Sequence, residues 1–145
     1  MILGCSYATA SSEFSPQDTN WHGIVNVTHS LQHSSHYVLA VGALSYAAHN
    51  SKGQMSIQAF KPGGSTNFDT NQKVYQGSTG VHSLRNSISE WISSHGMFYG
   101  MYKPGNTDAN VYRLMMAQES GSNFYTGLNS ASRSWIMLIE CTGVA

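Results

Sequence analysis

Charged side chains are scarce in this chain of 145 residues, where Asp, Glu, Lys and Arg together make up only 10%. An average soluble protein carries roughly 25%. The 7 basic and 7 acidic residues cancel, and the basic ones are too scattered to neutralise a nucleic-acid backbone. We therefore expect no nucleic-acid partner. Uncharged polar side chains supply the solubility instead, and such a surface repels neighbouring copies only weakly.

Long hydrophobic runs are missing as well. No apolar stretch approaches the roughly 20 residues that are needed to cross a bilayer, so we expect no membrane insertion. The first residues lack the basic and apolar regions of a signal peptide. This predicts synthesis in the cytoplasm without export.

Only two cysteines are present, Cys5 and Cys141, and they lie near opposite ends of the chain. If the terminal strands are neighbours, the two could form a disulfide that closes nearly the whole chain. The alternative is a pair of small buried thiols, which we favour because two cysteines in a chain without an export signal are usually reduced.

A recognisable set of catalytic residues is also lacking. No Gly-x-Ser-x-Gly elbow presents a nucleophilic serine. The four glutamates, Glu13, Glu90, Glu119 and Glu140, do not pair by spacing as the two carboxylates of a glycosidase would. We therefore expect neither an enzyme nor a bound cofactor.

What the chain does contain is a succession of strand-like segments separated by Gly, Asn, Ser and Pro. They cover residues 21–28, 36–48, 54–60, 73–76, 97–102, 111–118, 124–128 and 134–141. Seven to nine short strands at this spacing predict an all-β fold, an antiparallel β-sandwich or jelly roll. Residues 1–20 are expected to form an N-terminal arm, and residues 21–145 a single domain.

Two pairs of these segments suggest hairpins, because short turn sequences join 36–48 to 54–60 and 97–102 to 111–118. Residues 81–92 are ambiguous. Val81, Leu84, Ile88 and Trp91 recur at helical spacing, but part of the same stretch also alternates as a strand does, and we favour a strand.

The histidines His29, His33 and His36 fall within eight residues, and imidazole is a common metal ligand. No Cys, Asp or Glu lies nearby in the sequence to complete a set of ligands, so we expect no metal in a single subunit. One imidazole from each of three subunits could still meet on a three-fold axis, and His29 or His33 would then be the ligand.

Aromatic residues make up 11% of the chain. Exposed aromatic faces on a sandwich are suitable platforms for sugar rings. The members of such a platform would be Trp21, Tyr102, Tyr112 and Tyr125. The alternative, which we favour, is that these rings fill the core or the contacts between subunits.

The layout of the chain resembles small β-sandwich modules of tailed-bacteriophage virion proteins, which occur in tail fibres, head fibres and capsid decoration proteins. The likeness is carried by a Ser/Thr-rich lead into a first strand with Trp21, the central strand YVLAV at 37–41, paired segments with Gly/Asn loops, and the closing SWIMLIE at 134–140. It extends over nearly the whole chain. It implies a virion structural protein, and the short lead before the first strand suits a capsid decoration or minor structural subunit better than a fibre tip.

The resemblance also implies partners. They are other virion proteins of the capsid or tail and further copies of the chain, with a homo-oligomeric trimer favoured and the virion as the location. We expect the assembly contacts in the N-terminal arm at Met1, Ile2 and Leu3. The alternative function is a lectin-like module of a phage fibre that binds host-surface glycans through loop aromatics beside the turns at 61–63 and 103–105.

Overall fold

The computed structural model describes residues 2–10, 14–16, 18–61, 74, 82–86, 90–121, 123–126 and 133–142. These residues contain nine strands and no helix. The strands are β1 (Ile2–Ala10), β2 (His22–His29), β3 (Tyr37–Ala48), β4 (Ser51–Phe60), β5 (His82–Asn86), β6 (Ile92–Tyr102), β7 (Asn110–Ser120), β8 (Phe124–Thr126) and β9 (Ser134–Cys141).

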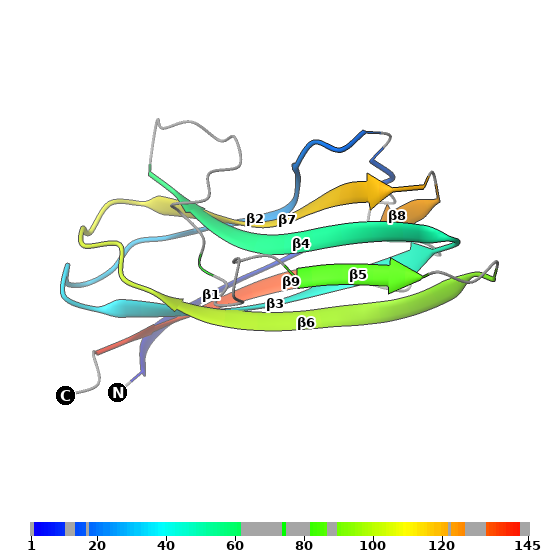
Figure 1. Cartoon of the computed structure of the whole chain (residues 1–145). Coiled ribbons are helices and arrows are strands. Elements are labelled where there is room, and N and C mark those ends of the chain that lie inside the picture. Colours follow the sequence, from blue (N-terminus) through cyan, green and yellow to red (C-terminus); the bar gives the residue numbers. More distant parts are fainter. Residues whose placement is uncertain are drawn as a thin grey trace.

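The strands form two antiparallel sheets that lie in two layers (Figure 1). Sheet I has the order β1-β9-β3-β6, and β8 adds to it by pairing with β3. Sheet II has the order β2-β7-β4-β5. Neighbours in each sheet come from distant parts of the chain, as in a jelly roll. The predicted all-β antiparallel sandwich is confirmed.

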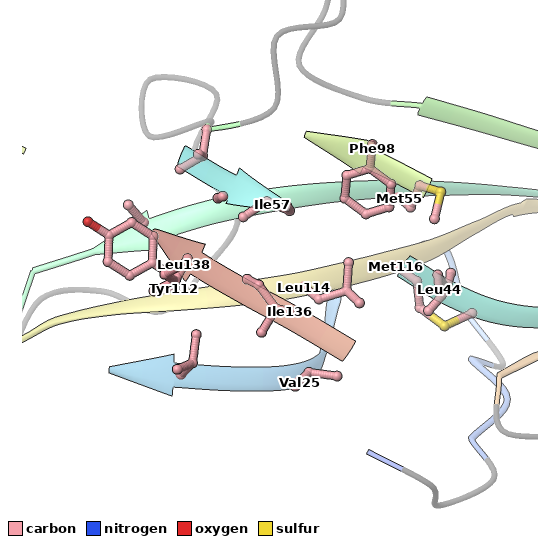
Figure 2. Close-up of a cluster of buried hydrophobic side chains, with 14 of the residues drawn as sticks. Val25, Leu44, Met55, Ile57, Phe98, Tyr112, Leu114, Met116, Ile136 and Leu138 are labelled. Carbon is pink, nitrogen blue, oxygen red and sulfur yellow. The ribbon is translucent and has the colours of Figure 1, made fainter. Parts of the chain in front are cut away.

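Alternating side chains explain why these segments are strands. In β9, Ile136 and Leu138 are completely buried, whereas Trp135 and Met137 on the opposite face are only half-buried. A period of two places one set of side chains between the sheets. Figure 2 shows Leu44, Ile57, Leu114, Ile136 and Leu138 meeting there as one hydrophobic core.

The two predicted hairpins are wrong. Although β3 and β4 follow one another through a short turn, β3 lies in sheet I and β4 in sheet II. The same is true of β6 and β7. Both connections pass from one layer to the other, because β3 already pairs with β9 and β6, and β4 with β7 and β5.

The N-terminal segment is part of the sandwich and does not form a separate arm. From Ile2 to Ala10, β1 pairs antiparallel with β9, with one irregularity between Ile2 and Gly4. Phe14 is also held to the sandwich, since its backbone exchanges two hydrogen bonds with Thr126 at the end of β8. The expected boundary at residue 20 therefore does not separate an arm from a domain.

The segment at 81–92, which could have been a helix or a strand, contains strands in the residues that the structure describes. His82–Asn86 forms β5 at the edge of sheet II, and Ile92 begins β6. Residues 81 and 87–89 lie outside the described residues, as does most of the strand expected at 73–76. The part of the chain that the structure describes contains no helix able to span a membrane.

Candidate functional site

The outer face of sheet I carries a continuous apolar surface. Pairing partners in antiparallel strands project to the same side, so the registers of β1, β9, β3 and β6 define rows across the sheet. Three adjacent rows are Cys5–Ile139–Leu39–Met101, Tyr7–Met137–Val41–Tyr99 and Thr9–Trp135–Ala43–Met97. We call these three rows the outer face.

The outer face is uncharged and much of it is exposed. The most exposed large side chains lie on the two edge strands, with Tyr7 at 60%, Met97 at 63% and Tyr99 at 70%. Four strands and a five-residue span give a flat area of roughly 300 Å². The largest apolar patch on a typical soluble monomer measures about 300–600 Å² and is often functional, which makes the outer face a candidate interaction surface.

The expected contact residues lie beside this face. Ile2 is 71% exposed and Leu3 is half-buried, and both belong to β1. Met1 lies outside the described residues. Ile2 and Leu3 therefore lie on the β1 edge of sheet I, and the residues of β9, β3 and β6 in the three rows were not among the residues expected from the sequence.

Glu140 is a carboxylate buried inside the sandwich, with a side-chain exposure of only 1%. Its Oε1 accepts hydrogen bonds from the backbone N–H of Gln32 at 2.8 Å and from Nδ1 of His36 at 2.7 Å. Its Oε2 lies 3.5 Å from Nε2 of His29. Through these contacts the carboxylate connects β9 to the loop between β2 and β3. They also supply the partners that a buried charge requires.

Burial by itself would raise the pKa of the Glu140 carboxyl. The hydrogen bonds from His36 and Gln32, together with the positive charge that His29 and His36 carry when protonated, hold that pKa below its ordinary value. Glu140 is therefore ionised at neutral pH, which keeps the connection to the loop intact.

The symmetric metal site is contradicted for His29. Its side chain is 8% exposed, its Nδ1 pairs with Oγ of Ser6 at 2.9 Å, and its Nε2 points toward Glu140. A ring held inside one subunit cannot meet its copies on an axis. His33 is exposed in the turn after β2, with Nδ1 at 3.2 Å from Oγ of Ser35. Among the described residues, no group of three or more potential ligands could hold a metal.

The four aromatic residues considered as a glycan platform do not gather on one exposed face. Tyr112 is completely buried, and burial together with the nearby Tyr102 and Glu140 raises the pKa of its hydroxyl. Its ring belongs to the core, as the favoured alternative had it, and cannot be part of a sugar platform. Tyr102 is half-buried and makes an edge contact with Tyr112 at 6.4 Å, and burial raises its pKa as well. Trp21 is half-buried just before β2, and Tyr125 lies on β8.

A small pocket of about 60 Å³ lies beside the two Lys-Pro-Gly turns. It is lined by Ala59, Phe60, Lys61, Tyr102, Asn106 and Asn110. Typical ligand pockets measure roughly 300–1,000 Å³, so this one holds a few water molecules and no sugar ring. Pro62 and Gly63 of the first turn are outside the described residues.

The two cysteines are free thiols although their strands are neighbours. Cys5 pairs with Ile139 across the β1–β9 ladder, while Cys141 pairs with Ile2. The thiol of Cys141 points to the carbonyl of Tyr37 on the other side of β9, at 3.8 Å. The favoured prediction of two small buried thiols is right in that neither cysteine is in a disulfide, and wrong about burial, since Cys5 is exposed and Cys141 is half-buried.

Comparison with known proteins identifies no family. No protein-family model matches the chain, and no curated protein matches it. Among solved structures, the chain is similar to the Eiger TNF of S. frugiperda, with 12% identity, 99% of this chain and 95% of that chain covered, and a TM-score of 0.43. It is also similar to a sugar-binding protein, the EclA C-terminal domain (14% identity, 93% and 81% covered, TM-score 0.40), and to murine APRIL (12% identity, 95% and 100% covered, TM-score 0.36). At such values these likenesses do not assign a function.

Proposed function

We propose that the protein is a structural subunit that assembles with copies of itself through the outer face of sheet I. One observation carries the proposal: three adjacent rows across four strands are uncharged and mostly apolar, and Tyr7, Met97 and Tyr99 at their ends stay exposed. A standard interface buries roughly 800 Å² per partner. The outer face would supply the apolar centre of such a contact, with neighbouring polar residues as its rim.

The most exposed side chains of the outer face lie on its two opposite edges, which favours a head-to-tail contact between copies. Tyr7 lies on the β1 edge of sheet I, and Met97 and Tyr99 lie on the β6 edge, while the side chains of the rows on the middle strands are half-buried or, at Ala43, buried. A contact that joins the β6 edge of one copy to the β1 half of the next is heterologous, and such a contact forms a ring when the rotation between copies closes and a filament when it does not. We expect a trimer, the smallest ring of this kind.

The biological setting that we propose is the surface of a virion, with the subunit in a decorating or minor structural role and without catalytic activity. The low charge of the chain supports this setting, because repeated subunits pack closely when their surfaces repel one another weakly. The test is mass spectrometry of purified phage particles from the source, in which the protein should be present in many copies. Its absence there would refute the virion role and leave self-association to be judged separately.

Self-association is tested by light scattering coupled to size-exclusion chromatography. The wild type should elute as a trimer, and the Tyr99→Lys variant should elute as a monomer with an unchanged far-UV spectrum, because a charge in the contact centre must be desolvated without a partner. Thr28→Lys is the control, since Thr28 is an exposed residue of β2 in the other sheet, away from the outer face. A monomeric wild type, or a Tyr99→Lys variant that stays trimeric, would overturn the proposal.

A further inference from the structure

Three ring side chains from separate parts of the sequence meet at the end of the sandwich where β3 ends and β6 begins. Trp91 is the central one, with its ring centroid 5.5 Å from that of His49 and 5.6 Å from that of Tyr125. The ring planes are tilted by 40° and 44°. We call this group the aromatic ledge.

The ledge is held in place and yet open to solvent. Trp91 keeps 53% of its surface exposed, although tryptophan is highly buried on average. The backbone N–H of His49 donates to the carbonyl of Asn123 at 3.0 Å, and the hydroxyl of Ser51 accepts from the N–H of Asn123 at 3.1 Å. These bonds tie the β3–β4 turn to the start of β8 and so fix the backbone that carries His49 and Tyr125, the two rings against which Trp91 packs. A site whose parts are held in place before binding loses less entropy when the ligand binds.

The ledge is separate from the outer face. Along β6, the exposed polar residues Ser93 and His95 lie between Trp91 and Met97, the nearest member of the three rows. Association through the outer face would therefore leave Trp91 in solvent. A second role for this end of the molecule is compatible with the assembly proposed above and does not depend on it.

Polar side chains surround the rings. Asn50 is exposed next to His49 in a turn with a positive φ of 46°, Glu90 is exposed next to Trp91, and Asn123 is half-buried two residues before Tyr125. Binding sites for small ligands combine an apolar surface with a few such polar groups. An aromatic face suits the C–H face of a pyranose ring, and amide and carboxylate groups suit its hydroxyls.

We propose that the aromatic ledge is a binding subsite for a neutral, pyranose-containing saccharide. The indole of Trp91 stacks on the sugar ring, Tyr125 and His49 hold the indole, and Asn50 and Glu90 provide hydrogen bonds to the hydroxyls. This site differs from the group of aromatics that the sequence indicated, of which it includes only Tyr125.

The first test is an array of neutral oligosaccharides built from glucose, galactose, mannose and N-acetylglucosamine, probed with the labelled wild-type protein. The best soluble oligosaccharide is then titrated against the protein, and the indole N–H signals are followed by NMR, so that avidity plays no part. The Trp91 signal, assigned by its loss in Trp91→Phe, should shift on titration. Trp91→Ala should weaken binding at least about tenfold.

Tyr7→Ala is the matched control, because it removes an exposed aromatic side chain of the outer face and should leave the affinity unchanged. The absence of any saccharide-dependent signal on the array would overturn the proposal. So would an unshifted Trp91 indole, an equal loss of affinity in Tyr7→Ala, or full affinity in a folded Trp91→Ala variant. None of these outcomes bears on the oligomeric state, so the two proposals fail independently.

Discussion

Replacing Glu140 by Gln should destabilise the fold substantially, although the side chain keeps its size. The change removes the charge that strengthens the 2.7 Å bond with His36, and it can place an amide N–H₂ opposite Nε2 of His29. A hydrogen bond to a charged group contributes about 1.5–3 kcal/mol, so we expect a loss of about 2–3 kcal/mol in the free energy of unfolding. For a domain of this size the melting temperature should fall by about 5–10 °C, measured by circular dichroism at pH 7.

The pH dependence provides a second readout of the same residue. Because the folded-state pKa of Glu140 is held below its unfolded value, its contribution is complete above the unfolded pKa and is lost as the pH falls through the folded pKa. Wild-type stability should therefore fall in acid more steeply than that of Glu140→Gln. Glu119→Gln is the control, since Glu119 is exposed on β7. Equal acid sensitivity in the wild type and Glu140→Gln, or a melting temperature lowered by less than about 2 °C, would refute this reasoning.

Two further substitutions test the core. Gly53→Ala should destabilise by about 2 kcal/mol or more in urea unfolding, because a Cβ there would lie 2.3 Å from the ring of the completely buried Phe124. Gly23→Ala is its control, as the nearest atom there is at 3.5 Å, and an equal loss in both variants would contradict the clash. Tyr112→Phe should leave the melting temperature unchanged or raise it, because the Tyr112 hydroxyl is buried without a partner among the described residues. A loss of more than about 1 kcal/mol there would mean that the hydroxyl is hydrogen-bonded.

The positions of most strands could be read from the sequence, because inward and outward side chains alternate. The pattern in β9 is clear enough to place its ends within a residue, at Ser134 and Cys141. How strands are joined could not be read in the same way. A short turn such as the one at Asn50 serves equally well for a hairpin and for a passage between layers, and only the distant partners of β3 and β4 decide which is formed.

The burial of Glu140 could have been predicted from the same alternation of inward and outward side chains. Glu140 shares its parity with Ile136 and Leu138, so it belongs to the inward set and requires partners. Which histidines provide them depends on the loop after β2, more than 100 residues away in the sequence. In the sequence, Trp91 fits a helical spacing of apolar residues, which does not distinguish it from a core residue. Its contacts with His49 and Tyr125 join distant parts of the chain, so no local pattern could predict them.

The place of β9 in sheet I has a consequence for the order of events during synthesis. It is the last of the nine strands in the sequence, yet it lies between β1 and β3, so Ile2 finds its partner Cys141 only after nearly all the other strands have been made. Until β9 leaves the ribosome, the inner edges of β1 and β3 are unpaired, and unpaired edges invite association with other nascent chains. Sheet I is therefore completed late in translation, and a ribosome that stalls before Ser134 leaves a chain that cannot close this sheet.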